Sequence, residues 1–182
     1  MRHGFKKEAR EIAAEVRGEL GLTPLEELDP WVLAEHLDIP VWALSSYSEI
    51  PRPVKHLSET ETGAFSAMIA CQGLHRVIIY NDGHAPTRRR ADIAHELAHA
   101  LLLHQPHPAL DGQPPRYDEI QEEEAKWLGG VLLVSDDFCL SCCHNDMEVS
   151  EAAALMGVSP QLMQWRINMS GAQRRVARAR AR

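Results

Sequence analysis

The segment DIAHELAHALLLH, residues 92–104, constrains the fold of this chain more than any other stretch. Its apolar residues recur with helical spacing, which predicts a helix that packs on the core. His95 and His99 lie four residues apart, so both imidazoles project from one face of that helix, about one turn apart. Such a pair is either two satisfied core histidines or one half of a metal site. The choice depends on whether the rest of the chain supplies a further ligand.

Two histidines at this spacing can reach a single zinc ion. Glu96 follows His95 and is rotated by about 100° around the helix axis, so its carboxylate can contact a zinc-bound water rather than the metal. Zinc lowers the pKa of that water, and the carboxylate can accept its proton during attack on a peptide carbonyl. The alternative is a core helix in which the glutamate occurs by chance.

A third protein ligand would decide between these interpretations. His104 lies five residues beyond His99 and therefore well round the helix, and no histidine occupies the last position of an HExxHxxGxxH pattern. A second predicted helix, DEIQEEEAKWLGGVLLVSDDF at 118–138, carries an acidic run near its start. Its periodicity places Glu122 on the face of its apolar residues. The acidic candidates in this helix are Glu119, Glu122, Glu123 and Glu124.

The remaining segments predict a mixed α+β fold. Residues 5–20 have amphipathic helical spacing and end at Gly21, whereas Asp29 and Pro30 are a typical N-cap and first residue of a helix. Strand and breaker signals give the other expected elements. These are a strand at 41–44, a loop at 45–62, hairpin strands at 64–70 and 75–80, a helix after Pro86 with Thr87 as candidate cap, a proline-rich loop at 105–116, and two helices flanking the turn at 157–160, the second opened by Ser159 and Pro160.

Composition limits the classes of protein that this chain can be. Its 182 residues suit one compact domain, and the net charge of −7 argues against general nucleic-acid binding. No apolar run is long enough to cross a bilayer, and the charged N-terminus lacks the apolar core of a signal peptide. We therefore expect a cytoplasmic protein that contacts no membrane. The Arg-rich run at 172–182 is typical of a solvated, frayed helix end.

The cysteines do not form a recognisable zinc site. Cys139, Cys142 and Cys143 cluster in the run CLSCCH, but a structural zinc site draws on two separated ligand pairs. No second pair is evident in the sequence. We interpret them as small, partly buried thiols.

Several of these motifs together resemble the ImmA/IrrE family of zinc metallopeptidases. In that family an HELGH-type helix is followed by a helix of the form ExEAN-x-FA-x-x-LL-M-P. Here IAHELAHALLLH is followed by EEEAKWLGGVLL, and VIIYND matches the family strand that ends in Asn, here Asn81. PWVLAEHLDIPVW is similar to the amino-terminal entry, and EAAALMGVSPQLMQWRI to the closing segment. The similarity runs, with gaps, from about residue 24 to about residue 170.

The resemblance implies a small zincin-like fold, with helices packed on a small sheet and a C-terminal helical segment. It places Ala125 on the family alanine, which puts Glu122 on the first glutamate of ExEA. The implied zinc ligands are then His95, His99 and Glu122, with Glu96 as catalytic base. We expect an N-terminal helix at 1–21, a metallopeptidase core at 22–138, a C-terminal helical segment at 139–171 and the Arg-rich tail at 172–182.

Three positions depart from the family pattern. Lys126 stands where the family has Asn or Asp, a position that could orient a ligand histidine by a hydrogen bond. Either another carboxylate or carbonyl, such as Asp92, does this instead, or the site is weakened. Val134 and Ser135 replace Met-Pro, and Ala98 replaces a common glycine. None of these changes removes a proposed ligand or the base.

The implied function is site-specific cleavage of a protein, and family members often cleave a helix-turn-helix transcriptional repressor. A second hypothesis is a zincin-fold regulator that binds a transcription factor without cutting it. A third uses the helix pair at 150–168 and the Arg-rich tail to bind DNA, but Met163, Trp165 and Ile167 make a poor base-reading surface. The group that stabilises the oxyanion stays open. Its candidates are Tyr80, His84, His107, Tyr117 and His144.

Overall fold

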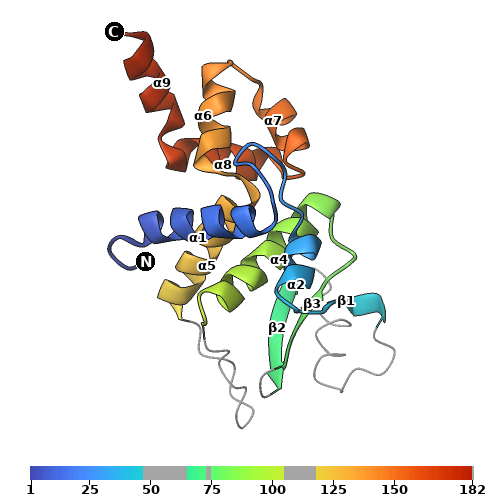
Figure 1. Cartoon of the computed structure of the whole chain (residues 1–182). Helices are drawn as coiled ribbons and strands as arrows, with labels where there is room; N and C mark the ends of the chain where they lie inside the picture. Colours follow the sequence, from blue (N-terminus) through green and yellow to red (C-terminus); the bar gives the residue numbers. More distant parts are fainter. Residues whose placement is uncertain (47–64, 73–74, 105–117, 182) are drawn as a thin grey trace.

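The computed structural model describes residues 1–46, 65–72, 75–104 and 118–181 (Figure 1). Within these residues it has eight α-helices, one 3-10 helix and one three-stranded sheet, a mixed α+β fold consistent with the predicted small zincin-like fold. The elements in chain order are α1 (Phe5–Glu19), α2 (Pro30–His36), β1 (Val41–Ala43), η1 (Leu44–Ser46), β2 (Ala67–Gln72), β3 (His75–Tyr80), α4 (Pro86–Leu101), α5 (Glu119–Leu133), α6 (Asp136–His144), α7 (Val149–Leu155), α8 (Pro160–Ser170) and α9 (Ala172–Arg180).

The sheet contains the predicted hairpin. Its strand order is β1-β3-β2, with β1 parallel and β2 antiparallel to β3, and Ile69 lies opposite Ile78. The first hairpin strand begins at Ala67, three residues later than expected, and the predicted turn lies partly outside the described residues. Among the described strands β2 pairs on one side only, and it also contacts α4.

Helix α4 packs against the sheet, α2 and α5, and α1 lies across α5 (Figure 1). The core between them is continuous from the amino-terminal helix to the second long helix. Its fully buried apolar side chains are Phe5, Ala9, Leu28, Leu33, Ile78, Ile93, Leu97, Ala98, Ala125, Leu128 and Leu132. The apolar faces predicted for residues 5–20 and 92–104 are therefore the faces that are buried.

The second predicted helix is interrupted. Its sequence predicts one helix through Phe138, but α5 ends at Leu133 and α6 begins at Asp136. Val134 is extended, with φ −135° and ψ 105°, and the Ser135 side chain accepts a hydrogen bond from the Phe138 backbone N–H. Ser135 is thus the N-cap of a new helix, and the break turns α6 towards α8 and α9 (Figure 1).

Helix termini agree with the sequence prediction at most positions. Asp29 caps α2 by accepting from the Trp31 N–H at 2.9 Å, and Ser159 caps α8 by accepting from the Leu162 N–H at 3.2 Å. Thr87 is not a cap, because α4 already begins at Pro86. Proline fixes its own φ near the helical value and lacks only an N–H that would stay unpaired there, so the helix starts two residues earlier than a cap at Thr87 would allow.

The C-terminal helices α6 to α9 have their own apolar core, which contains Cys139, Met156, Met163 and Ile167 and reaches Ala94 of α4. Arg166 of α8 is fully buried, donates to the Val134 carbonyl at 3.0 Å and pairs with Asp136. These contacts attach the C-terminal helices to the end of α5. No helix in the described part of the chain is long and apolar enough to span a membrane.

Helices α4 and α5 approach each other closely at Gly129. A Cβ atom at that position would lie 3.1 Å from the Ala94 carbonyl oxygen and 3.2 Å from the His95 backbone nitrogen. Both atoms belong to rigid helical backbone, so a side chain at 129 would force the two helices apart. Only glycine allows this approach without displacement.

We expect Gly129→Ala to lower the free energy of unfolding by about 1–3 kcal/mol, the usual cost of an overpacked core. Gly18→Ala on α1 is the matched control, because a Cβ there would meet nothing within 4 Å. It should raise stability by up to about 1 kcal/mol through helix propensity. Urea unfolding of both variants checks the prediction. A stability gain of equal size at both positions would show that the close approach imposes no constraint.

Candidate metal centre

Three polar side chains from α4 and α5 meet where the two helices face each other. The Nε2 atoms of His95 and His99 lie 3.1 Å apart. Glu122 reaches both of them, with Oε2 at 3.2 Å from His95 Nε2 and Oε1 at 3.4 Å from His99 Nε2. All three side chains are partly buried. The structure thus brings together the three residues that the sequence analysis selected as ligands.

This arrangement fits a single metal ion. The three ligand atoms lie within 4.8 Å of one another and could hold a metal. A tetrahedral zinc site with metal–ligand distances of about 2.0–2.1 Å has ligand–ligand edges of about 3.3 Å. The measured separations of 3.1, 3.2 and 3.4 Å are close to that value. Two imidazoles and one carboxylate are also a donor set of catalytic zinc sites, which keep one position open for water or substrate.

The protonation preferences of His99 and Glu122 suit a cation, whereas that of His95 does not. Burial, together with the neighbouring His95, lowers the pKa of His99 to about 4, which keeps its imidazole neutral, as a metal ligand must be. Hydrogen bonding from His95 lowers the pKa of Glu122, so this carboxylate is charged at neutral pH. Burial would lower the pKa of His95, but the hydrogen bond to Glu122 and the charge of Glu96 raise it.

Glu96 lies on the side of α4 that faces the sheet. Its Oε2 accepts a hydrogen bond from the backbone N–H of Ile69 on β2 at 2.9 Å. Burial raises the pKa of Glu96 to about 7. The β2 edge of the hairpin therefore holds the Glu96 carboxylate close to the two histidines, although Ile69 and Glu96 are more than twenty positions apart in the sequence.

The other acidic residues of α5 have different positions. Glu124 is 2% exposed and is bound by the Arg2 side chain, and Glu123 pairs with the amino group of Met1. Glu119 lines a hollow that it shares with His95, Glu122, Glu123 and Lys126. Of the four glutamates, only Glu122 has carboxylate contacts to both histidines among the described residues.

In the described part of the chain, Asp92, which we considered as the group that orients a ligand histidine, has contacts to other residues and none to His95 or His99. Asp92 Oδ2 lies 3.3 Å from His84 Nδ1, and 3.8 Å from Arg88 Nε. Asp92 lies three residues before His95, yet these contacts direct it towards the loop that precedes α4. In that loop His84 Nε2 also lies 3.3 Å from the Asn81 amide nitrogen.

Sequence reasoning missed one residue at the site. His104 lies outside α4, and its Nδ1 is 3.0 Å from His99 Nδ1. Helical spacing excludes it from the site only if the helix continues to residue 104, but α4 ends at Leu101. The chain then turns back, which brings the imidazole behind His99.

Three of the five candidates for oxyanion stabilisation lie in the described residues, and their described contacts are with groups other than His95, His99 and Glu122. The Tyr80 ring packs edge-on against Trp31, with centroids 5.7 Å apart, and His84 is bound by Asp92 and Asn81. His144, at the end of α6, lines a hollow between α6 and α9. His107 and Tyr117 lie outside the described residues.

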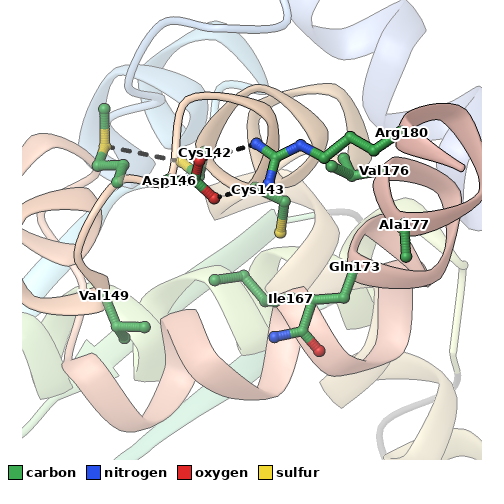
Figure 2. Close-up of a pocket in the computed structure, with 10 residues that line it drawn as sticks. Cys142, Cys143, Asp146, Val149, Ile167, Gln173, Val176, Ala177 and Arg180 are labelled. Carbon is green, nitrogen blue, oxygen red and sulfur yellow. Dashed lines mark hydrogen bonds and ion pairs between the residues drawn. The ribbon is translucent and has the colours of Figure 1, made fainter.

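The cysteines of the CLSCCH run lie in the C-terminal helices, away from the histidine cluster. Cys139 and Cys142 are buried, and Cys143 is partly buried, each as a free thiol. Burial raises the pKa of Cys139 and Cys142 to about 11. Figure 2 shows Cys142 and Cys143 beside the Asp146–Arg180 ion pair, in a pocket of about 490 Å³. The sequence analysis expected partly buried thiols, which describes Cys143, whereas Cys139 and Cys142 are more deeply buried.

Comparison with known proteins agrees with this geometry. The sequence model of the IrrE N-terminal-like domain, a metallopeptidase family, matches residues 34–168. A search of curated proteins found no match. The matched region contains β1 to β3, the α4 and α5 pair and the C-terminal helices as far as α8. The chain therefore belongs to the IrrE N-terminal-like family of metallopeptidase-type domains, the ImmA/IrrE family that its motifs resemble.

Proposed function

We propose that this protein is a zinc-dependent endopeptidase that cuts a protein substrate at a specific site. His95, His99 and Glu122 would hold the metal, and Glu96 would act as the base. The observation that carries the proposal is the convergence of the three ligand atoms within 4.8 Å, with Glu96 on the same helix as the two histidines.

Bound zinc would supply Lewis acidity at the scissile carbonyl and make water acidic enough to be deprotonated at neutral pH. The protein residues supply position and proton transfer. The Ile69 N–H holds Glu96 Oε2, while Oε1 has no hydrogen-bond partner among the described residues. That oxygen can accept the proton of the attacking water and later pass it to the leaving amine.

The sheet supports a protein substrate. Strand β2 has an unpaired edge among the described strands, and the Ile69 N–H on that edge points to Glu96. An extended peptide can add to such an edge by backbone hydrogen bonds, which would place its carbonyl groups beside the cluster. We propose that the substrate is a helix-turn-helix transcriptional repressor, as the family resemblance implies, and that cleavage takes place in the cytoplasm.

A second candidate is a regulator that binds its partner without cutting it. Lys126 favours this alternative because it lines the same hollow as His95 and Glu122. A cation there opposes metal binding electrostatically, and it cannot accept a hydrogen bond from a ligand histidine. The two candidates differ in whether new peptide termini are produced.

Metal removal separates the two candidates, and the substrate need not be identified beforehand. A lysate of the source cells is incubated with zinc-loaded protein or with protein stripped by a chelator, and new amino termini are labelled and identified by mass spectrometry. We expect one or a few proteins to acquire a new terminus with the zinc-loaded form, and none with the stripped form. Restoring zinc should restore the cut. Identical termini in both samples would rule out a metallopeptidase.

A further inference from the structure

We propose that His104 is a positioning residue that orients the ligand His99, and that Glu124 and Arg2 hold His104 in place. This inference deepens the proposed metal site and rests on it. The juxtaposition consists of three successive contacts: His99 Nδ1 to His104 Nδ1 at 3.0 Å, His104 Nε2 to Glu124 Oε2 at 3.9 Å, and Glu124 to Arg2. None of these contacts involves the ligand atoms themselves.

The end of α4 explains how His104 reaches His99. The Leu103 N–H donates to the Ala100 carbonyl at 3.2 Å, and the His104 N–H donates to the His99 carbonyl at 3.0 Å. This pair of bonds is a Schellman motif, which folds the residue after the helix back over the last turn. Leu103 occupies the left-handed position of the motif, with φ 53° and 71% exposure. A leucine is strained there, so the surrounding contacts must hold the turn.

The contact fixes the tautomer of His99. To bind a metal, Nε2 of His99 must carry a lone pair, and its proton then resides on Nδ1. His104 Nδ1 is positioned to accept that proton in a hydrogen bond. The remaining proton of a neutral His104 is then on Nε2, which lies 3.9 Å from Glu124 Oε2, so the carboxylate acts on it by charge rather than by a direct hydrogen bond. Each proton along the series thus points away from the metal and towards the carboxylate.

Glu124 is the fixed end of the series. Its side chain is buried, and a buried carboxylate is stable only when it is paired and hydrogen-bonded. Arg2 donates to it three times, from the backbone N–H at 2.8 Å and from Nε at 2.9 and 3.0 Å. Arg2 lies outside the region matched by the family, residues 34–168. The amino-terminal segment of this chain therefore contributes to the orientation of a metal ligand.

A carboxylate that hydrogen-bonds a ligand histidine raises its basicity and fixes its ring, and loss of such a partner typically costs about 10- to 100-fold in metal affinity. Here a second imidazole connects the carboxylate to the ligand. His104 orients His99. At the family position from which an Asn or Asp could orient a ligand histidine, this chain has Lys126. One ligand histidine is therefore still oriented, but by a residue that follows α4 rather than by one on α5.

The test measures zinc affinity of the purified chain by competition with a chromophoric chelator. His104→Leu removes the acceptor for His99 Nδ1, and we expect it to weaken zinc binding by about 10- to 100-fold. His104→Asn places its Oδ1 close to where histidine carries Nδ1, so it should restore most of the loss. His36→Leu is the control, because it makes the same substitution at a histidine on α2 whose partner is not a proposed ligand. His36 Nε2 lies 2.9 Å from Glu19 Oε2.

Two further readouts separate orientation from folding. The visible spectrum of the Co²⁺-loaded protein should change with His104→Leu and return with His104→Asn, whereas metal-free thermal unfolding should not follow that order. Arg2→Met should weaken zinc binding in the same direction by a smaller factor. Zinc binding by wild type together with unchanged affinity in His104→Leu overturns this inference alone. Failure of wild type to bind zinc overturns the proposed metal site as well.

Discussion

Zinc-loaded Glu96→Gln should bind the protein substrate and fail to cut it. Glutamine has nearly the same shape, and its amide oxygen can still accept from the Ile69 N–H, so the β2 contact is preserved. The amide cannot take up a proton at neutral pH. We expect the rate of cleavage to fall by about 10²- to 10⁴-fold, the usual contribution of a general base.

The measurement is the rate of fragment formation from the identified substrate, with zinc content determined on the same samples. Glu35→Gln, at an exposed position on α2, is the control for a generic loss of one carboxylate. If Glu96→Gln cleaves at the wild-type rate, Glu96 is not the base. A regulator that only binds its partner would show the same binding for wild type and both variants, with no fragments from any of them.

The sequence could predict which three side chains converge because each of them lies within a regular helix. The spacing of His95 and His99 fixes their direction once a helix is assumed, and Glu122 shares a face with buried apolar residues of α5. Periodicity therefore determines which side chains project towards the partner helix. Periodicity alone could not show that α4 and α5 lie beside each other. Only the family resemblance predicted this pairing, and the close approach at Gly129 is what allows it physically.

Helix ends were predictable only where they have a chemical marker. Helix α1 ends in a Schellman motif with Gly21 in the left-handed position, and α7 ends similarly with Gly157. Helix α4 ends in the same motif, but with Leu103 in that position. A leucine gives no signal for a left-handed turn, so helical spacing predicts a helix through residue 104 and gives no sign of the contact between His104 and His99.

The break between α5 and α6 did carry a signal. Ser135 is followed by two aspartates and precedes an apolar run, which is typical of a helix N-terminus. The apolar residues on both sides continue the helical spacing of α5, and this periodicity concealed the cap. Contacts between distant segments, such as Arg2 with Glu124 or Ile69 with Glu96, have no local signal at all, because they arise only from tertiary packing.

Glu122→Ala should remove the metal, whereas Glu123→Ala should not. The two residues are adjacent in one acidic run, and each substitution deletes one carboxylate and leaves a residue with high helix propensity. Only Glu122 contacts both histidines among the described residues, and Glu123 is 58% exposed beside the amino terminus. Loss of a residue that hydrogen-bonds a metal ligand costs up to about 100-fold in metal affinity. We expect Glu122→Ala, which removes a ligand itself, to lose more than this.

Metal content by mass spectrometry, with wild type, Glu122→Ala and Glu123→Ala side by side, gives the result directly. Thermal unfolding gives an independent one, because a ligand bound only by the folded state raises the melting temperature. Zinc should therefore stabilise wild type and Glu123→Ala but have little effect on Glu122→Ala. Retention of zinc by Glu122→Ala and its loss from Glu123→Ala would move the third ligand by one residue. The helical face that now selects Glu122 would then be wrong, and the packing of α5 on α4 would have to differ by about 100° of rotation.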